Sequence, residues 1–255
     1  MTEKEIRSGG VHVYNLDCFK GMEKINSNSI DLILTDPPYG ITTRNEWDTD
    51  IDLGTMWDEF RRIIKEDGNI VITSTMSFAI KLIKTATVPF RYELIWVKPP
   101  VGFLNAGRQP LRAHELVLVF SKKSGRYFPQ KYGRKKRNTH RLTSATNNYG
   151  KFACIDTYDL SNPTSVFYFA NSNKGEHPTQ KPIGLFKYLI STYSQEGEVV
   201  LDPFLGSGTT AVACKELGRL CIGFELVPDY YKIAERRLEN TKRQLKLNLE
   251  ALKYE

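Results

Sequence analysis

The sequence lacks the features that would place the chain in a membrane or build it around disulfides. None of its apolar runs reaches the roughly 18 residues that are needed to span a bilayer. The amino-terminal segment MTEKEIRSGG is polar and mixed in charge, unlike a secretory signal. The 4 cysteines include no CxxC pair, so we expect neither a metal site nor a disulfide framework. A reducing cytoplasm is the expected compartment.

Acidic residues are missing from one stretch of the chain. Residues 122–141 (KKSGRYFPQKYGRKKRNTHR) hold nine basic residues and no acid. The net formal charge is +7, so the rest of the chain carries 7 − 9 = −2. A local basic cluster that includes Tyr and Phe favours contact with a polyanion, although a solvated loop is the alternative. The candidate phosphate contacts are Lys122, Lys123, Arg126, Lys131, Arg134, Lys135, Lys136, Arg137 and Arg141.

Short apolar segments alternate with helical patterns along most of the chain, which is typical of an α/β sheet. Because the apolar segments are continuous runs of Val, Ile and Leu, we expect helices on both faces of the sheet. The helix at 54–66 should end at Asp67-Gly68, where glycine can adopt a left-handed cap. The expected strands are 11–15, 30–35, 69–74, 92–97, 115–120, 198–202 and 220–225, and the expected helices are 17–26, 54–66, 75–85, 181–194, 208–218 and 228–250.

The alternation stops between residues 121 and 176. This stretch is basic at first and then rich in Asn, Ser, Thr and Tyr, and it is too long for a simple connection in a compact domain. We therefore predict a functional insertion at 121–176 that separates two parts of one domain, 1–120 and 177–255. The charged last helix is expected to be solvated, with an oligomer contact as the alternative.

A glycine-rich turn follows one of the expected strands, in the sequence VVLDPFLGSGTT (199–210). Gly206 and Gly208 allow the backbone to approach a ligand closely, and the helix that follows presents free N–H groups. The turn lacks the lysine of a phosphate-binding P-loop and fits the dinucleotide fingerprint only loosely. Glu225, at the tip of the next strand, is placed to hold two ribose hydroxyls, or it is an acid at a helix start. Asp202 suits a positively charged ligand, so the set favours S-adenosylmethionine.

The segment Asp36-Pro37-Pro38-Tyr39 follows the expected strand at 30–35. Proline restricts the residue before it and stiffens the turn. The Asp36 carboxylate and the Pro37 carbonyl thus become fixed acceptors, with Tyr39 as a stacking surface. Two acceptors and a ring form a socket for an aromatic amine, in which Asp36 would also stabilise positive charge on the nitrogen. Taken alone, the segment is equally compatible with a rigid turn.

Three motifs together resemble the DNA amino-methyltransferases, which methylate the exocyclic amine of adenine or cytosine. They are DPPY at 36–39, HPTQKP at 177–182 and DPFLGSGT at 202–209. Their order, with the catalytic half before the cofactor half, resembles the circularly permuted class called beta. The resemblance covers most of the chain. It implies an α/β, Rossmann-like class I methyltransferase fold in which the basic insertion is a target-recognition region.

The resemblance also implies roles for individual residues. Asp36, Pro37, Pro38 and Tyr39 would form the catalytic turn, with Tyr39 stacked on a base that is flipped out of the duplex. No general base is required, because the amine proton can leave after attack.

In the implied cofactor site, the glycine turn would line the methionine and the ribose. Glu225 would bind the ribose hydroxyls, and Asp17-Cys18 would lie beside the adenine of the cofactor. Thr179 and Lys181 would meet the carboxylate. Cys18 is alternatively a small buried residue, and Lys181 alternatively marks an ordinary helix start. The implied cofactor contacts are Asp17, Cys18, Asp36, Thr179, Lys181, Asp202, Phe204, Gly206, Gly208, Thr209 and Glu225.

The first residue of the DPPY motif favours adenine N6 as the target. Family members that act on adenine mostly begin this motif with Asp, whereas those that act on cytosine N4 mostly begin it with Ser. Methylation of RNA or of a protein amide, and a non-catalytic nucleic-acid-binding module, stay open. The implied partners are double-stranded DNA, a second copy in a homodimer and a cognate restriction endonuclease, with no membrane. The implied location is the cytoplasm of a bacterial or phage-type system, in association with the nucleoid.

Overall fold

The computed structural model describes residues 4–39, 51–101, 106–133, 160–170 and 180–242. The chain forms two compact units, and the first comprises Met1–Phe128 and Ser165–Leu247. The second unit includes Pro129–Thr164 and holds one antiparallel pair of short strands, β7 (Tyr132–Gly133) and β8 (Leu160–Ser161). The elements described below belong to the first unit.

Among the described residues, nine strands form one mixed sheet. The central strands β2, β11, β10, β3 and β4 are mutually parallel, whereas β6 pairs antiparallel with both β4 and β5. In spatial order the strands are β1 (Lys4–Ser8), β2 (Val11–Asn15), β11 (Leu220–Phe224), β10 (Val199–Asp202), β3 (Ile30–Thr35), β4 (Ile64–Ser74), β6 (Arg112–Phe120), β5 (Phe90–Val101) and β9 (Val166–Tyr168).

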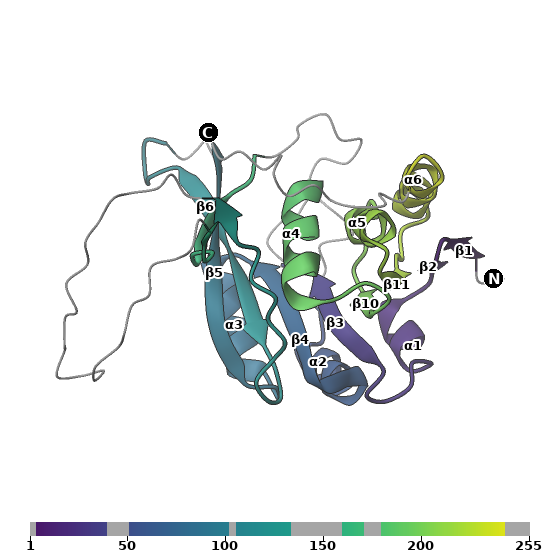
Figure 1. The fold of residues 1–255 in the computed structure, drawn as a ribbon. Coiled ribbons are helices and arrows are strands. Elements are labelled where there is room, and N and C mark those ends of the chain that lie inside the picture. Colours follow the sequence, from purple (N-terminus) through teal and green to yellow (C-terminus); the bar gives the residue numbers. More distant parts are fainter. Residues whose placement is uncertain (1–3, 40–50, 102–105, 134–159, 171–179, 243–255) are drawn as a thin grey trace. The chain divides into compact units, whose positions relative to one another are not determined.

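Helices cover both faces of this sheet, which confirms the expected α/β architecture (Figure 1). They are α1 (Cys18–Met22), α2 (Leu53–Ile63), α3 (Met76–Thr85), α4 (Ile183–Tyr193), α5 (Thr209–Leu217) and α6 (Pro228–Glu239). Buried side chains of α4, α5 and α6 pack with Leu32 and Val200 on one face. Those of α1, α2 and α3 pack with Ile33 and Leu201 on the other, because successive strand residues point to opposite faces. No helix within the described ranges is long and apolar enough to cross a membrane.

The chain after α2 departs from the prediction. We expected a helix that continues to a left-handed cap at Gly68, but β4 already begins at Ile64. Ile64 has an extended backbone (φ −70°, ψ 138°) and pairs with Ile30 of β3, since a β-branched residue fits a half-buried strand well. A Cβ on Gly68 would lie 2.9 Å from the Asp31 carbonyl oxygen. Close packing against β3, and not a helix cap, therefore requires this glycine, and the predicted helix end was wrong.

Both ends of the predicted insertion pack in the first unit. Near its start, the Phe128 N–H donates to the Thr192 carbonyl of α4 at 2.8 Å. Near its end, β9 pairs in parallel with β5, and Phe167 is buried in the core. The division into 1–120, 121–176 and 177–255 stays a prediction, and these two stretches belong to the first unit.

Candidate active site

The direction of the chain connections reverses between β10 and β3. These strands are parallel neighbours, yet β10 leads through α5 to β11 on one side, and β3 leads through α2 to β4 on the other. In α/β sheets, ligands bind beyond the carboxyl ends of the strands at such a switch point. Asp202 ends β10 and Asp36 follows the end of β3, so the two motifs meet at this point.

Asp202 joins the two motifs through its buried carboxylate. The Thr35 hydroxyl donates to Oδ1 at 2.7 Å, the Phe204 N–H donates to the same oxygen at 3.1 Å, and the Thr210 hydroxyl donates to Oδ2. Burial raises the pKa of Asp202 to about 7. Asp202 is only 2% exposed, and its predicted contact with the cofactor stays a prediction. Its observed role is to hold β3, the glycine turn and α5 together.

The two glycines of the turn are required for different reasons. Both have positive φ, 57° at Gly206 and 82° at Gly208, where a side chain would be strained. A Cβ on Gly208 would lie 2.7 Å from the Cβ of Ala234 in α6. A Cβ on Gly206 would have no atom within 4 Å, so this side of the turn has space for a ligand. Gly208 caps α5 without a side-chain hydrogen bond, so first-turn N–H groups can bind an anion.

Glu225 supports the glycine turn from the next strand. Its carboxylate accepts the N–H of Gly206 at 2.7 Å and the N–H of Val227 at 2.7 Å. Burial raises its pKa. Each carboxylate oxygen has two lone pairs, so acceptor positions are left for hydroxyl groups. The side chain of Asn15, at the end of β2, donates to the Glu225 and Leu226 carbonyls at 2.8 and 3.1 Å and fixes this segment.

Helix α6 holds the glycine turn in place through Arg237, and this contact was not predicted from the sequence. The Arg237 guanidinium donates to the carbonyl and hydroxyl of Ser207 at 2.6 and 2.9 Å and to the Thr209 hydroxyl at 3.2 Å. Tyr231 and Leu238 are buried on the same helix. The prediction of a solvated outer helix was therefore wrong for the inner face of α6. The dense charges of this segment concealed the apolar spacing that would have revealed that face.

The DPPY turn at 36–39, which we predict to be the catalytic turn, is held rigid through Asp36. Its Oδ1 accepts hydrogen bonds from the Tyr39 hydroxyl, at 2.6 Å, and from the Thr73 hydroxyl of β4. Phe78 of α3 packs against the Tyr39 ring with a centroid distance of 5.1 Å. Burial, followed by the nearby Asp36 charge, raises the pKa of Tyr39 well above its ordinary value, so this hydroxyl stays a neutral donor. The turn contains no cis peptide bond in the described residues.

Lys181 pairs with Asp36 of the DPPY turn, and its predicted contact with the cofactor stays a prediction. Its ammonium lies 2.6 Å from Asp36 Oδ2 and 3.5 Å from Glu115 Oε2. Glu115 is in turn paired with Lys98 of β5. We predicted that Lys181 binds the carboxylate of the cofactor, and the structure gives this ammonium two protein carboxylates as neighbours. Neither Glu115 nor Lys98 was identified from the sequence, because each occurs as an isolated charge within a strand.

Comparison with known proteins agrees with this geometry. The DNA methylase family matches residues 30–236. This chain belongs to that family. The type II methyltransferase M.HpaI of Haemophilus parainfluenzae is 30% identical to the methylase over 241 residues, which cover 88% of this chain and 73% of M.HpaI. The type II methyltransferase M2.DpnII of Streptococcus pneumoniae is 27% identical over 266 residues, with coverage of 94% and 93%.

Solved structures share the fold of the methylase. The M1.HpyAVI–SAM complex aligns with a TM-score of 0.60 and 24% identity, over 89% of this chain and 99% of that chain. The PvuII DNA methyltransferase, which is cytosine-N4-specific, aligns with a TM-score of 0.61 and 17% identity, over 95% and 99%. The predicted fold class, the predicted family and the predicted cofactor, S-adenosylmethionine, are confirmed.

The other predicted cofactor residues have identifiable places in the methylase. Asp17 caps α1, with its carboxylate accepting the N–H of Phe19 and Lys20 at 3.1 and 3.2 Å. Burial raises the pKa of Cys18 to about 12, so its thiol stays neutral. Phe204 packs partly buried against the core, and Thr209 opens α5. Their contacts with the cofactor stay predictions, and Thr179 lies outside the described residues.

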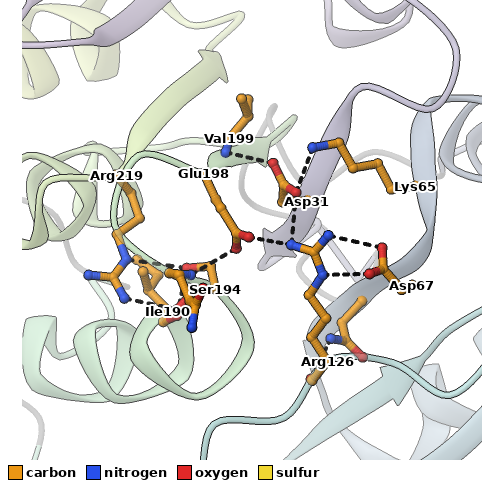
Figure 2. A network of polar contacts seen from close by, with 11 residues as sticks. Asp31, Lys65, Asp67, Arg126, Ile190, Ser194, Glu198, Val199 and Arg219 are labelled. Carbon is orange, nitrogen blue, oxygen red and sulfur yellow. Dashed lines mark hydrogen bonds and ion pairs between the residues drawn. The ribbon is translucent and has the colours of Figure 1, made fainter.

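The first part of the basic segment is already paired within the methylase. Figure 2 shows Arg126 between Asp67, at 2.7 Å, Asp31, at 3.1 Å, and Glu198. Asp31 also accepts the Val199 N–H at 3.0 Å, which places this network at the amino ends of β3 and β10, opposite Asp36. Arg126 therefore ties strands together, and its predicted contact with DNA stays a prediction.

The remaining predicted DNA contacts divide into three groups. Lys122 donates to the Ile64 carbonyl at 2.9 Å and lies 3.3 Å from Glu66, and Lys123 lies 3.2 Å from the same carboxylate. These two charges are therefore partly neutralised. Lys131 is exposed in the second unit. Residues Arg134, Lys135, Lys136, Arg137 and Arg141 lie outside the described residues, and their phosphate contacts stay predictions.

Proposed function

We propose that this methylase transfers a methyl group from S-adenosylmethionine to the N6 amine of an adenine that is flipped out of double-stranded DNA. One observation carries the proposal. The catalytic turn and the glycine turn share one edge of the sheet and are linked by the hydrogen bond from Thr35 to Asp202. A socket for an amine and a site for a methyl donor are thereby held in a fixed relation, and family membership supports the reaction class.

Asp36 has one acceptor position left for a substrate. A carboxylate offers about four lone-pair sites. The hydroxyls of Tyr39 and Thr73 occupy two sites on Oδ1, and the Lys181 ammonium occupies one on Oδ2. The remaining site on Oδ2 can accept one N–H of an amine, and the Pro37 carbonyl can accept the other. Both N–H bonds are then gripped, and the nitrogen lone pair is turned out of the ring plane.

Asp36 also acts on the charge that develops during transfer. The amine nitrogen becomes positive as its bond to the methyl carbon forms, so a carboxylate at hydrogen-bond distance stabilises the transition state more than the ground state. The proton leaves the nitrogen after that bond has formed, and no general base is needed during attack. Tyr39, anchored by Asp36 and backed by Phe78, supplies a fixed ring for stacking on the flipped base.

The glycine turn fits the chemistry of the methyl donor. Open space beside Gly206 allows a ligand to approach the backbone, and the first N–H groups of α5 favour an anionic group such as a carboxylate. Glu225 keeps acceptor positions for ribose hydroxyls. When bound, S-adenosylmethionine supplies a methyl group that is electrophilic because it is attached to a sulfonium.

The choice of base depends on the DPPY motif. Asp36 favours adenine by resemblance, whereas the cytosine-N4-specific PvuII enzyme shares the fold, so N4 of cytosine is the competing target. The test is transfer from isotopically labelled cofactor to duplex DNA, followed by mass spectrometry of the nucleosides. N6-methyladenine is the expected product. N4-methylcytosine would refute the adenine assignment, and no transfer to any nucleic acid would favour a non-catalytic binding module.

A variant of Asp36 separates catalysis from cofactor binding. Asp36→Ala should abolish transfer while the Kd for S-adenosylmethionine changes little. In this proposal the main task of the carboxylate is to bind the amine, and the predicted contact of Asp36 with the cofactor adds little to cofactor affinity. Calorimetric titration of the cofactor provides the second measurement. An equal loss of transfer and of cofactor affinity would show that the role of Asp36 is misassigned.

Two partners and a location belong to the same proposal. A cognate restriction endonuclease is supported by the type II names of the relatives from Haemophilus and Streptococcus. A homodimer follows from resemblance to the beta class, and sedimentation of the purified protein tests it. Because its substrate is DNA, we place the methylase at the nucleoid of a bacterial or phage-type cytoplasm.

A further inference from the structure

A buried chain of alternating charges leads from the interior to Asp36. Lys98 pairs with Glu115, Glu115 lies 3.5 Å from the Lys181 ammonium, and Lys181 lies 2.6 Å from Asp36. The exposed fraction of the side chains rises along this chain, from 7% at Lys98 to 11%, 13% and finally 24% at Asp36. The chain is thus most open at the residue that faces the substrate in the proposed function.

Lys98 and Glu115 hold Lys181 from the interior side. They lie on β5 and β6, adjacent antiparallel strands whose register positions them. Burial alone would lower the pKa of Lys181, but Asp36 and Glu115 together raise it, so the ammonium stays charged with three N–H donors. One N–H serves Asp36. Glu115 Oε2, which has no hydrogen-bond partner among the described residues, attracts the ammonium at longer range. An N–H is left for a ligand.

The pair of Asp36 and Lys181 presents an acceptor beside a donor. Oδ2 and Nζ are 2.6 Å apart, and each retains hydrogen-bonding capacity. In adenine, the N6 amine and the N1 ring nitrogen are bonded to the same carbon, so a donor and an acceptor lie side by side at a similar separation. Cytosine has the same arrangement at N4 and N3. Resting on the proposed function, we propose that Lys181 donates a hydrogen bond to this ring nitrogen while Asp36 accepts one from the amine.

This arrangement separates amino bases from keto bases. Guanine and thymine carry a carbonyl oxygen and a ring N–H at the corresponding positions, in the reverse order. Their oxygen would face the Asp36 carboxylate, and their N–H would face the Lys181 ammonium. Both contacts are repulsive, and both leave polar groups without partners. Lys181 is therefore a specificity-determining residue for the class of base, and Glu115 and Lys98 are positioning residues that act through it.

Base analogues test the proposal in the wild-type enzyme. The target adenine of a mapped recognition site is replaced by 1-deazaadenine, which has CH in place of N1, or by the matched control 7-deazaadenine, which has CH in place of N7. A hydrogen bond from a charged donor predicts that kcat/KM falls on the order of 10- to 100-fold with 1-deazaadenine, with little change for the control. Loss of N1 also weakens pairing in the duplex, which favours flipping, so a fall in rate would run against that effect.

Variants test the positioning residues. Glu115→Gln should lower the ratio of kcat/KM for adenine to that for 1-deazaadenine, because Lys181 is held less well, while an unchanged Kd for S-adenosylmethionine shows that the fold is intact. Glu216→Gln is the matched control, since Glu216 pairs with Lys187 elsewhere in the core at 17% and 18% exposure. This control should leave the ratio unchanged.

Each outcome has a distinct meaning. Equal kcat/KM for adenine and 1-deazaadenine in the wild-type enzyme would overturn the proposed hydrogen bond from Lys181 to the ring nitrogen. An unchanged ratio in Glu115→Gln would overturn the positioning role of Glu115. If the natural product is N4-methylcytosine, 3-deazacytosine takes the place of 1-deazaadenine, and the same loss is expected. Absence of transfer to both natural bases would instead overturn the proposed function itself.

Discussion

Replacing Asp202 with Asn removes a buried titration from the junction of the two motifs. The Asp202 carboxylate accepts hydrogen bonds from Thr35, Thr210 and the Phe204 N–H, and burial raises its pKa to about 7. Asn has almost the same size. Because a hydroxyl can accept as well as donate, Thr210 can rotate to accept the new NH₂ group. Asp202→Asn therefore changes the proton balance of the folded protein with little change in packing.

The sign and size of the effect follow from the pKa of Asp202. Its pKa rises from 3.8 to about 7 on folding, so between these values the folded protein keeps a proton that the unfolded chain has lost. The folded state binds more protons, and its stability falls as the pH rises through this window. At about 1.4 kcal/mol per pKa unit, the whole shift amounts to about 4 kcal/mol. About 2 kcal/mol of this falls between about pH 5 and pH 7, because the folded protein has itself lost half of the proton at pH 7.

Urea unfolding of both proteins at about pH 5, 6, 7 and 8 measures this effect. The free energy of unfolding of the wild-type protein should fall by about 2 kcal/mol relative to Asp202→Asn between about pH 5 and pH 7 and then change little above pH 7. All other titrating groups are common to both proteins, so they cancel in the difference. A difference that does not depend on pH would mean that the three hydrogen bonds offset burial and that Asp202 titrates near its ordinary value.

Three further substitutions test the supports of the site. Arg237→Gln should weaken S-adenosylmethionine binding about 10-fold in calorimetry, because charged hydrogen bonds to the glycine turn are lost. The control Arg236→Gln, at an exposed position of the same helix, should leave binding unchanged. Equal effects of the two variants would refute the idea that Arg237 supports cofactor binding by holding the glycine turn. Gly208→Ala should cost more than about 1 kcal/mol of unfolding free energy, through its positive φ and its overlap with Ala234, and unchanged stability would contradict this. Arg126→Gln should lower the free energy of unfolding by up to about 3 kcal/mol and leave the salt dependence of DNA binding unchanged. A flatter dependence of log K on log salt concentration would show that Arg126 contacts a phosphate.

Much of the fold could be predicted from local patterns. The strands at 30–35 and 199–202 are mostly Val, Ile and Leu, and such runs signal a sheet that is covered on both faces. The error in the predicted end of the helix at Ile64 also has a clear cause. Pairing with Ile30 of β3 draws the chain into the sheet, and a pattern read along one segment does not contain the partner strand.

The two motifs of the site were also visible in the sequence, because DPPY and the glycine turn depend on local backbone constraints. Proline and glycine restrict or extend the backbone wherever they occur. The family and the cofactor were predicted from these two motifs, and comparison with known proteins confirmed both. Local chemistry was thus sufficient for the kind of reaction that the chain performs.

Folding alone set the partners of the charged side chains. Lys181, Arg126 and Arg237 are ordinary basic residues in the sequence. In the structure, Lys181 pairs with Asp36, Arg126 links the starts of strands and Arg237 holds the glycine turn. Arg126 reaches Asp31 across 95 positions of sequence. A long side chain bonds to whichever buried acceptor lies within its reach, and that acceptor comes from a distant segment brought close by the sheet order. Motifs in the sequence therefore identified the chemistry of this methylase, whereas the packing of distant segments determined which partner each of these charged side chains binds.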